Sequence, residues 1–552
     1  MPSRTSFYRA LSLPLLAAFL LPAALRAQGG EGQLPPLQIE DVTVIGKKSV
    51  ALPKSRKGEV TDTTRYVLPA GDSLALGPRV SSLTGSGGEL PRYREGERPL
   101  HARAEFSIGT FVSPHLRLGG EWIEPRWDLG AHIDYRGTTG FRDSTEASAL
   151  GFDAGASVLL GDNTSPFGTM RLRAGVERLG ENYILYGNTA APYDRSRSFT
   201  SFALDLARED AGAFTYRMRL EYASTALDDR IVDTIPSVSA AEPRLLLEVG
   251  APIDSAFSVQ GRVAFGSTSL QYALPTTSLA STLLEAGMQW KVSPELSVAA
   301  GAGFASAGAS DSSGTHSLFL YHLVGRYALS PELALSGGIS SEMRDARYRE
   351  RLLAAPYVDR EIVLVPERVP LRLTAGGEYR SELFSAGGNL LFEASEGTPV
   401  VVRDSVPGAL RYAATSTTSI GLELNAASRL TEQIELRGEA RIRSARDTAE
   451  RHVPMLPSFE LGLQGRYHLT DAITLGADLR GIGARAVSFD PTAEMLPAMM
   501  LLDLNGEWKL QSHIALTAAV NNLLASKPML WDNYVGQGLE LRVGARFDFN
   551  NQ

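Results

Sequence analysis

The chain has 552 residues, of which 43% are hydrophobic and 21% are charged, and its formal net charge is −8. That mild acidity gives no reason to expect a nucleic-acid partner. The chain contains no cysteine, which excludes disulfides and thiolate chemistry. Its 53 glycines and 30 prolines favour many turns and few long helices.

The N-terminus has the pattern of a secretory signal peptide. Arg4 and Arg9 supply positive charge, and residues 11–25 are apolar apart from one serine. Cleavage after Ala27 would leave a polar new N-terminus. The alternative is an uncleaved anchor helix, but the apolar run is short for a span of about 20 residues. We therefore expect residues 1–27 to be a signal peptide and the mature protein to leave the cytoplasm.

Residues 28–98 differ in composition and periodicity from the rest of the chain. They hold six prolines, a basic run at 54–57 and little sustained periodicity. This composition predicts an irregular segment, which lies either in the periplasm or inside the lumen of a larger domain.

From about residue 99 the sequence alternates strictly between apolar and polar residues. In residues 539–549 one face carries Leu, Leu, Val, Ala, Phe and Phe, and the other carries Glu, Arg, Gly, Arg and Asp. Residues 434–443 repeat the pattern with Glu and Arg on the polar face. Because side chains of a strand point alternately to its two faces, each such segment predicts a strand with one apolar and one charged side.

Short polar turns recur between these strands, as in Leu329-Ser-Pro-Glu-Leu333. Their spacing leaves room for two strands of about 9–11 residues and one longer loop per repeat. Ten turns join twenty strands, and further strands at 101–111 and 539–549 bring the expected number to twenty-two. The expected turns lie at 124–126, 161–166, 210–212, 253–256, 292–296, 329–333, 380–382, 430–434, 469–473 and 510–514.

Longer polar and irregular loops are expected on the opposite side. Short turns at one end and long loops at the other are typical of outer-membrane barrels. Aromatic residues near the strand ends fit interfacial girdles. The expected loops are 188–198, 228–242, 307–316, 345–364, 397–410, 447–455 and 488–494, and the expected girdle residues are Phe111, Trp122, Trp127, Trp290, Tyr327, Tyr379, Tyr467 and Trp508.

The predicted fold is therefore all-β. Residues 99–552 form a transmembrane antiparallel β-barrel of about 22 strands, preceded by the short irregular segment. A soluble all-β protein such as a propeller is the competing fold. It is disfavoured because its sheets would bury many of the alternating charges at a high cost in free energy.

The C-terminus resembles that of TonB-dependent outer-membrane receptors. The stretch Leu516-Thr-Ala-Ala-Val-Asn-Asn-Leu-Leu524, then Trp531-Asp-Asn-Tyr534 and the terminal Phe547-Asp-Phe549, looks like the last two strands of that family. Three residues, Asn550, Asn551 and Gln552, follow the closing aromatic, which departs from the family pattern. The resemblance covers residues 101–552, mainly as architecture. It implies an outer membrane of a Gram-negative cell, contact with outer-membrane lipid, and assembly by the barrel assembly machinery.

The stretch Ile39-Glu-Asp-Val-Thr-Val-Ile-Gly-Lys-Lys48 is similar to a TonB box. Such a box adds as a strand to the sheet of a TonB-type periplasmic protein, held mainly by backbone hydrogen bonds. An ordinary short strand packed inside the barrel mouth is the alternative. The residues expected to bind the periplasmic partner are Asp41, Val42, Thr43, Val44, Ile45 and Gly46.

The chain departs from the family in one large respect. TonB-dependent receptors carry a plug domain of well over a hundred residues between box and barrel. Here about fifty residues separate Lys48 from the first expected strand, and they carry none of the Gly-rich motifs of a plug. We therefore expect a relative without the usual plug, for which energised transport is in question.

No pattern in the sequence indicates an enzyme. The eight histidines form no His-x-x-His or His-Glu-x-x-His motif, and no phosphate-binding loop or nucleophile elbow is present. The prediction is therefore no catalytic residues, no metal site and no cofactor, although scattered Ser, His and Asp residues of a barrel enzyme would leave no pattern. The charged strand faces predict a solvated lumen wall, or a surface that holds the N-terminal segment or a polar solute.

Three functions remain open. In the first, the barrel takes up or binds an unknown solute, with residues 28–98 acting as a reduced plug. In the second, it is a passive pore. In the third, it is a scaffold for another envelope protein that fills the lumen. The place of residues 28–98 distinguishes them. The first is the preferred prediction.

Overall fold

The computed structural model describes residues 100–161, 167–188, 192–208, 214–230, 237–272, 276–309, 314–362, 364–404 and 407–550. The expected signal peptide (1–27), the N-terminal segment (28–98) and the TonB-box-like stretch (39–48) lie outside the described residues. The six residues expected to bind a periplasmic partner lie there too.

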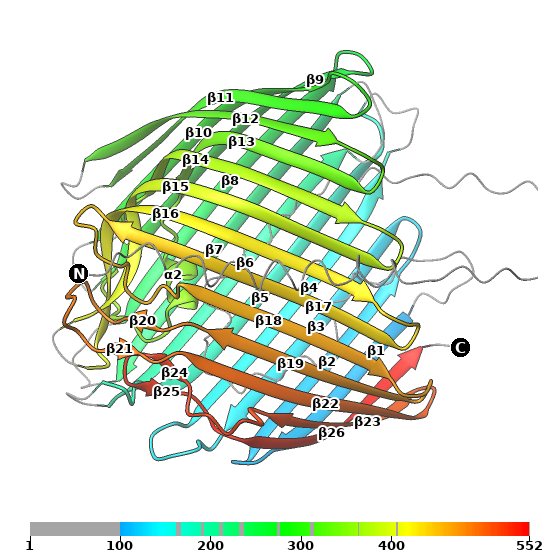
Figure 1. The fold of residues 1–552 in the computed structure, drawn as a ribbon, viewed down its shortest axis with the longest axis vertical. Helices are drawn as coiled ribbons and strands as arrows, with labels where there is room; N and C mark the ends of the chain where they lie inside the picture. The colour runs from blue at the N-terminus through cyan, green and yellow to red at the C-terminus, as the bar shows by residue number, and fades with distance from the viewer. Residues whose placement is uncertain are drawn as a thin grey trace, which may run out of the picture. The chain divides into compact units, whose positions relative to one another are not determined.

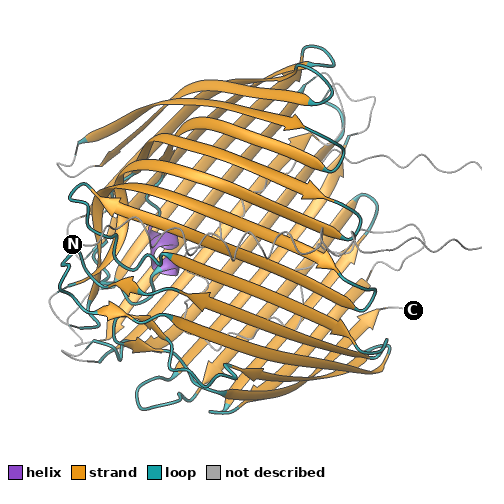
Figure 2. Ribbon diagram, in the orientation of Figure 1, coloured by secondary structure: helices purple, strands orange, loops and turns teal. Residues whose placement is uncertain are grey.

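Strands make up nearly all of the described chain (Figure 2). Twenty-two of them form one antiparallel sheet: β1 (Leu100–Gly109), β2 (Ser113–Ile123), β3 (Trp127–Thr138), β4 (Ala147–Leu160), β5 (Met170–Ile184), β6 (Asp194–Arg208), β7 (Thr215–Arg230), β8 (Val238–Pro252), β9 (Phe257–Gln271), β10 (Thr276–Lys291), β11 (Leu296–Ala309), β12 (Thr315–Ala328), β13 (Leu333–Arg344), β14 (Glu367–Arg380), β15 (Phe384–Arg403), β16 (Leu410–Arg429), β17 (Ile434–Asp447), β18 (Phe459–His468), β19 (Ile473–Ile482), β22 (Met499–Gln511), β23 (Ile514–Asn521) and β26 (Glu540–Asn550). Two short ribbons, β20 (Arg485–Ala486) with β21 (Met495–Leu496) and β24 (Met529–Trp531) with β25 (Tyr534–Val535), and the helix α2 (Tyr348–Ala354) complete the described elements.

The sheet closes on itself because β1 pairs with β2 on one side and with β26 on the other. The closing register sets Phe106 opposite Ala545, and nine residue pairs make up this seam. In Figure 1 the blue first strand and the red last strand lie side by side. Closure gives every one of these strands a paired neighbour on each side, as a sheet in lipid requires. The predicted barrel and its predicted twenty-two strands are confirmed.

Four of the short turns are shaped by a hydroxyl group near their start. In the β12–β13 turn, Ser330 Oγ accepts hydrogen bonds from the backbone N–H of Glu332 and Leu333 at 3.2 and 3.1 Å. The side chain thereby satisfies two N–H groups that the tight turn leaves free. Ser293, Thr431 and Thr470 do the same in three other turns.

Eight of the ten predicted turns fall on described residues and lie where they were expected, all at one end of the barrel (Figure 1). The turns expected at 161–166 and 210–212 lie largely outside the description. The strands on either side of each nevertheless pair as predicted, β4 with β5 and β6 with β7.

The apolar faces of the strands form the outer surface of the barrel. The eight predicted girdle aromatics are 37–52% exposed. Seven flank the short turns, and six of these stand opposite the first residue of a neighbouring strand. The eighth, Phe111, lies at the other end, in the β1–β2 connection. The rings of Trp122 and Trp127 stack in parallel at 6.2 Å. A ring of Trp and Tyr at the short-turn end is what a membrane interface favours.

Several loop predictions were too long because the paired strands continue into the residues expected to be loops. Residues 397–410 were expected to be a loop, but β15 runs to Arg403 and β16 begins at Leu410, with Val400 paired to Ala413. The buried side chains of Val400 and Val402 pack against Val453 from the next loop, and this packing continues the ladder. Strands β6 and β8 likewise begin inside the loops expected at 188–198 and 228–242.

The region expected at 345–364 as a polar, irregular loop is instead folded, and it contains α2. No helix in the described ranges is long and apolar enough to cross a membrane.

Candidate functional site

The β13–β14 connection, residues 345–366, folds into the barrel at the end opposite the short turns; we call it the internal loop and that end the outer mouth. Figure 1 shows α2 surrounded by the strands near this end. Phe199 of β6 is fully buried in the same apolar cluster as the loop, whereas Phe202, on the opposite face of β6, is 48% exposed. The loop therefore packs on the lumen side of the wall. Its buried apolar residues are Ala346, Tyr348, Leu352, Ala355, Tyr357, Val358, Ile362 and Leu364.

Arg195 of β6 binds the internal loop through its backbone. Its Nε and Nη2 donate to both carboxylate oxygens of Asp229 on β7, at 2.6 and 2.8 Å. Its Nη1 donates to the carbonyl oxygens of Pro356 and Val358, at 3.0 and 2.6 Å. Both charged side chains are buried, and a buried charge is stable only when it is paired and hydrogen-bonded. Both members of the Arg195–Asp229 ion pair therefore belong to the wall, and only Nη1 of Arg195 contacts the loop.

Three more wall side chains donate to carbonyl oxygens of the loop. Arg197 Nη1 donates to Leu352 O at 2.5 Å while its Nε binds Glu181. Tyr183 donates to Pro356 O at 2.7 Å, and Tyr412 donates to Arg351 O at 2.8 Å. Together with Arg195, these side chains donate five hydrogen bonds to carbonyl oxygens of the loop.

Glu242 of β8 holds the first turn of α2. Its carboxylate accepts hydrogen bonds from the backbone N–H of Tyr348 at 2.8 Å and of Arg349 at 3.2 Å. The residue before the helix, Arg347, makes no side-chain cap, so this wall carboxylate satisfies N–H groups that a helix start leaves free. Thr268 donates to the same carboxylate at 3.1 Å.

A stack of tyrosines joins the internal loop to the loop between β23 and β26. The rings of Tyr357 and Tyr534 are 3.8 Å apart and nearly parallel. Burial raises the pKa of both phenols above the ordinary value, so both are neutral. Tyr534 also donates to Gly408 O at 3.2 Å. Three loops thus meet at one point of the outer mouth.

Two further buried side chains fix the other loops around this stack. Asp532 accepts from Arg403 Nε at 2.6 Å and from Gly408 N at 3.0 Å. Arg485 of β20 donates to the carbonyl oxygens of Met529 and Leu530 at 2.8 and 3.1 Å. Burial lowers the pKa of Arg485 to about 10. The loops of the outer mouth are therefore tied to one another as well as to the wall.

A cavity of about 130 Å³ lies beside the tyrosine stack. Tyr183, Tyr186 and Tyr357 form part of its lining, together with residues of β22, β23 and the β3–β4 and β23–β26 loops. Asn521 Oδ1 and Gln537 Nε2, both from lining residues, have no hydrogen-bond partner within the described part of the chain. The cavity beside the tyrosine stack is therefore lined by polar groups that the described chain leaves unsatisfied.

Below the internal loop, the charges predicted for the lumen wall pair with one another across neighbouring strands. Arg217 donates to Asp205 at 2.7 Å, and Arg441 donates to Glu423 at 2.9 Å. These pairs neutralise each other within the sheet. In the described residues, no group of three or more His, Asp or Glu is arranged to hold a metal ion.

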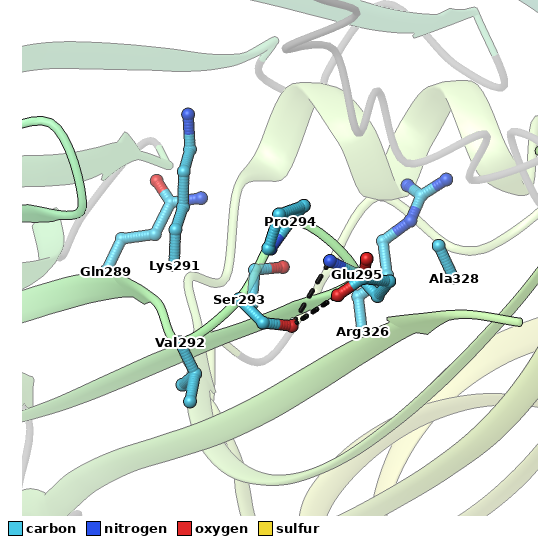
Figure 3. Close-up of a pocket in the computed structure, with 9 residues that line it drawn as sticks. Gln289, Lys291, Val292, Ser293, Pro294, Glu295, Arg326 and Ala328 are labelled. Carbon is cyan, nitrogen blue, oxygen red and sulfur yellow. Dashed lines mark hydrogen bonds between the residues drawn. The ribbon is translucent and has the colours of Figure 1, made fainter.

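A second hollow, of about 680 Å³, lies at the β10–β11 turn at the short-turn end (Figure 3). Ser293 Oγ accepts from the backbone N–H of Glu295 at 3.2 Å and donates to its carboxylate at 2.8 Å. These are the turn-forming bonds described above. We therefore interpret this hollow as a feature of the barrel rim.

The sequence did not predict the internal loop as a functional element. Residues 345–364 were expected to be polar and irregular, which is wrong: they include Leu352, Leu353, Val358 and Ile362. That apolar content was the signal that could have shown a packed segment. The predicted partner-binding residues, Asp41 to Gly46, lie outside the described residues.

Comparison with known proteins gives a likeness in structure alone. No family model matches the sequence, and no curated protein matches it. Among solved structures, the iron transporter FrpB from Neisseria meningitidis (F3-3 variant) is similar with a TM-score of 0.66 at 10% identity, over 82% of each chain. The ferric-catecholate import receptor Fiu from E. coli K12 has a TM-score of 0.64 at 11% identity, over 83% of this chain and 82% of that one. The copper transporter OprC has 0.62 at 13%, over 83% and 81%.

These neighbours are TonB-dependent receptors, the family that the C-terminal motifs resemble. In this chain the barrel begins at Leu100, which leaves no room for a usual plug between Lys48 and β1. At 10–13% identity the likeness concerns the fold. This chain therefore has the 22-strand barrel fold of the TonB-dependent receptors.

Proposed function

We propose that this chain is an uptake barrel of the Gram-negative outer membrane, which admits a solute when a TonB-type periplasmic protein engages its N-terminal segment. The observation that carries the proposal is a closed 22-strand barrel whose outer mouth is spanned by its own packed internal loop. A lumen of this width left open would breach the permeability barrier. Packed loops across the mouth favour controlled uptake over a passive pore.

The names of the similar structures suggest the first solutes to test. They are an iron transporter, a ferric-catecholate import receptor and a copper transporter. A metal ion bound to a chelator is therefore the first class of solute for binding and growth assays. The proposal assigns no catalytic step to the chain.

The periplasmic half of the proposal rests on residues 39–48. Their pattern suits β-augmentation, in which a partner's sheet gains one strand. The chain has no native cysteine, so a single Val44→Cys substitution provides a unique crosslinking site. We expect it to form a disulfide with a cysteine placed in the docking sheet of the TonB-type protein. Ser81→Cys, in the same N-terminal segment, is the matched control. Equal crosslinking at both positions would argue against a docking strand.

The plug-like half is tested by single-channel conductance in planar bilayers. We would compare the mature chain with a variant lacking residues 28–97. A closed full-length protein and a larger conductance after the deletion would support a reduced plug. High conductance in both proteins would instead indicate an open pore or a barrel awaiting a partner. Low conductance in both would show that this segment does not close the lumen.

A further inference from the structure

We propose that the internal loop, residues 345–366, is a gate that closes the outer mouth and swings away from the lumen wall to open it, with Glu242 as one of its latches. The proposal goes beyond the uptake function, because it assigns the closing element and its hinge. It depends neither on the solute nor on the periplasmic partner.

The first argument is what the loop covers. Its backbone and apolar side chains pack on the lumen faces of β5 to β9 and β16, next to wall residues that are fully buried. Val358 also pairs with Leu410 at the start of β16, and Asp359 N donates to Leu410 O at 2.6 Å. The loop thus bridges from its origin at β13 and β14 to β6 and β7 across the mouth.

The second argument is that the loop can leave the wall without leaving a buried charge unpaired. Arg195 keeps Asp229, and Arg197 keeps Glu181, when the carbonyl oxygens of the loop leave. Removing one member of a buried ion pair costs about 3–5 kcal/mol, and opening avoids that cost because both pairs stay on the wall. Only neutral carbonyl groups change partners, and water can replace the arginine and tyrosine donors for them.

The third argument is that the closed state contains destabilising features within the loop. Arg351 is buried with a hydrogen bond to Val365 O at 2.8 Å and a contact with the Tyr412 ring, and burial still lowers the pKa of its guanidinium group. Tyr357 borders the cavity of about 130 Å³, so its packing is incomplete. Helix α2 has only seven residues and depends on Glu242 for its first turn. Opening exposes Arg351 to water and removes the cavity beside Tyr357. Helix α2 needs only local unfolding for the loop to leave.

The fourth argument is a hinge. The two ends of the loop leave from neighbouring paired strands, β13 and β14. Just below, the ladder is irregular at Ser340–Glu342 in β13 and at Arg368–Leu371 in β14. Bulges of this kind redirect a strand and loosen its pairing. The loop can therefore move as a unit about its base while the rest of the barrel stays intact.

The test uses the full chain and one engineered cysteine. Ala203 lies on the lumen face of β6, two inward-facing positions farther from the outer mouth than Phe199, in a chain that has no native cysteine. Ala203→Cys in intact cells is treated with a membrane-impermeant fluorescent maleimide. With the gate in place, we expect slow labelling that goes to completion. Its rate should level off at high reagent concentration, where the opening of the loop becomes limiting.

Three further proteins carry the same cysteine. Glu242→Gln weakens the hold on α2, and losing one hydrogen bond to a charged group should raise the labelling rate about tenfold. Glu423→Gln is the matched control, since this wall carboxylate pairs with Arg441 far from the loop, and it should leave the rate unchanged. Replacing residues 347–363 with a short Gly-Ser turn should give the fastest labelling. Heat-modifiable migration of each protein confirms that its barrel has formed.

Each other outcome overturns the proposal in a defined way. Fast labelling of the unmodified loop would mean that the mouth is not closed by it. No labelling at any time would make the loop a fixed seal. An unchanged rate after loop replacement would show that another element closes the mouth, and an unchanged rate in Glu242→Gln would remove Glu242 as a latch. None of these results bears on the Val44→Cys crosslink, so the gate and the uptake function can fail separately.

Discussion

Gly408 lies where the β15–β16 loop crosses the β5–β6 loop, and its backbone φ is +78°. A Cβ atom at this position would collide with the backbone carbonyl of Gly187. Gly408→Ala therefore combines an unfavourable φ with a backbone clash, and we expect a loss of about 2 kcal/mol or more in the stability of the outer mouth. Gly325→Ala is the control, because a Cβ there meets nothing within 4 Å. Equal stability of the two variants in urea unfolding from vesicles would contradict the close crossing of the loops.

The tyrosine stack predicts how the outer mouth responds to alkaline pH. Burial raises the pKa of Tyr357 and Tyr534 above the unfolded value of about 10. An acid whose folded pKa is raised contributes its full stability below the unfolded pKa, and this contribution is lost as the pH rises toward the folded pKa. We expect tyrosinate absorbance from these residues to appear only when the mouth unfolds. Tyr357→Phe should weaken this alkaline transition; normal titration of Tyr357 in the intact barrel would refute its burial.

At the scale of single elements, the Arg195–Asp229 pair tests how the internal loop is held. Arg195→Ala leaves Asp229 buried without its cation, so we expect a loss of about 3–5 kcal/mol together with release of the loop. The double variant Arg195→Ala/Asp229→Ala removes the lone charge. It should recover most of the barrel's stability, but not the hydrogen bonds to Pro356 and Val358.

Trypsin added to intact cells distinguishes these effects, because the loop exposes cleavable bonds when it leaves the wall. We expect fast cleavage in both variants and much slower cleavage in the parent chain. Protection of the loop in the double variant would show that Arg195 does not hold it. The arginines of the loop are Arg347, Arg349, Arg351 and Arg360.

The elements also show what sequence can and cannot predict. The short turns were predicted correctly because their chemistry is local: Ser330 bonds to N–H groups two and three residues away. The strands were also predicted correctly, because the alternation of apolar and polar residues is local in sequence. The internal loop was missed because its partners are distant in sequence; Glu242 precedes Tyr348 by 106 positions, and Arg195 precedes Val358 by 163. Strand ends were misplaced where packing against another loop, as at Val400, extends the ladder.

At the scale of the whole molecule, whether a side chain faces lipid or the lumen predicts how much a new charge there lowers the stability of the barrel. Leu284 of β10 is 61% exposed on the outer, lipid-facing side. Leu284→Arg places a cation in the apolar band, and we expect a loss of about 2–4 kcal/mol if it lies near the bilayer midplane. Gln289→Arg, on the lumen side of the same strand near the rim, should change stability little (Figure 3). Unfolding in urea from lipid vesicles measures both, and equal losses would contradict the assigned faces.

The seam between β1 and β26 has a consequence for biogenesis. It joins residues at the two ends of the described chain, as in the bond from Arg103 to Asp548, 445 positions apart. Contacts of such long range form late and slowly. Until β26 is delivered, the chain is an open sheet with two bare edges, each able to pair with another copy and aggregate. The sheet therefore remains open to such pairing until its last strand is in place.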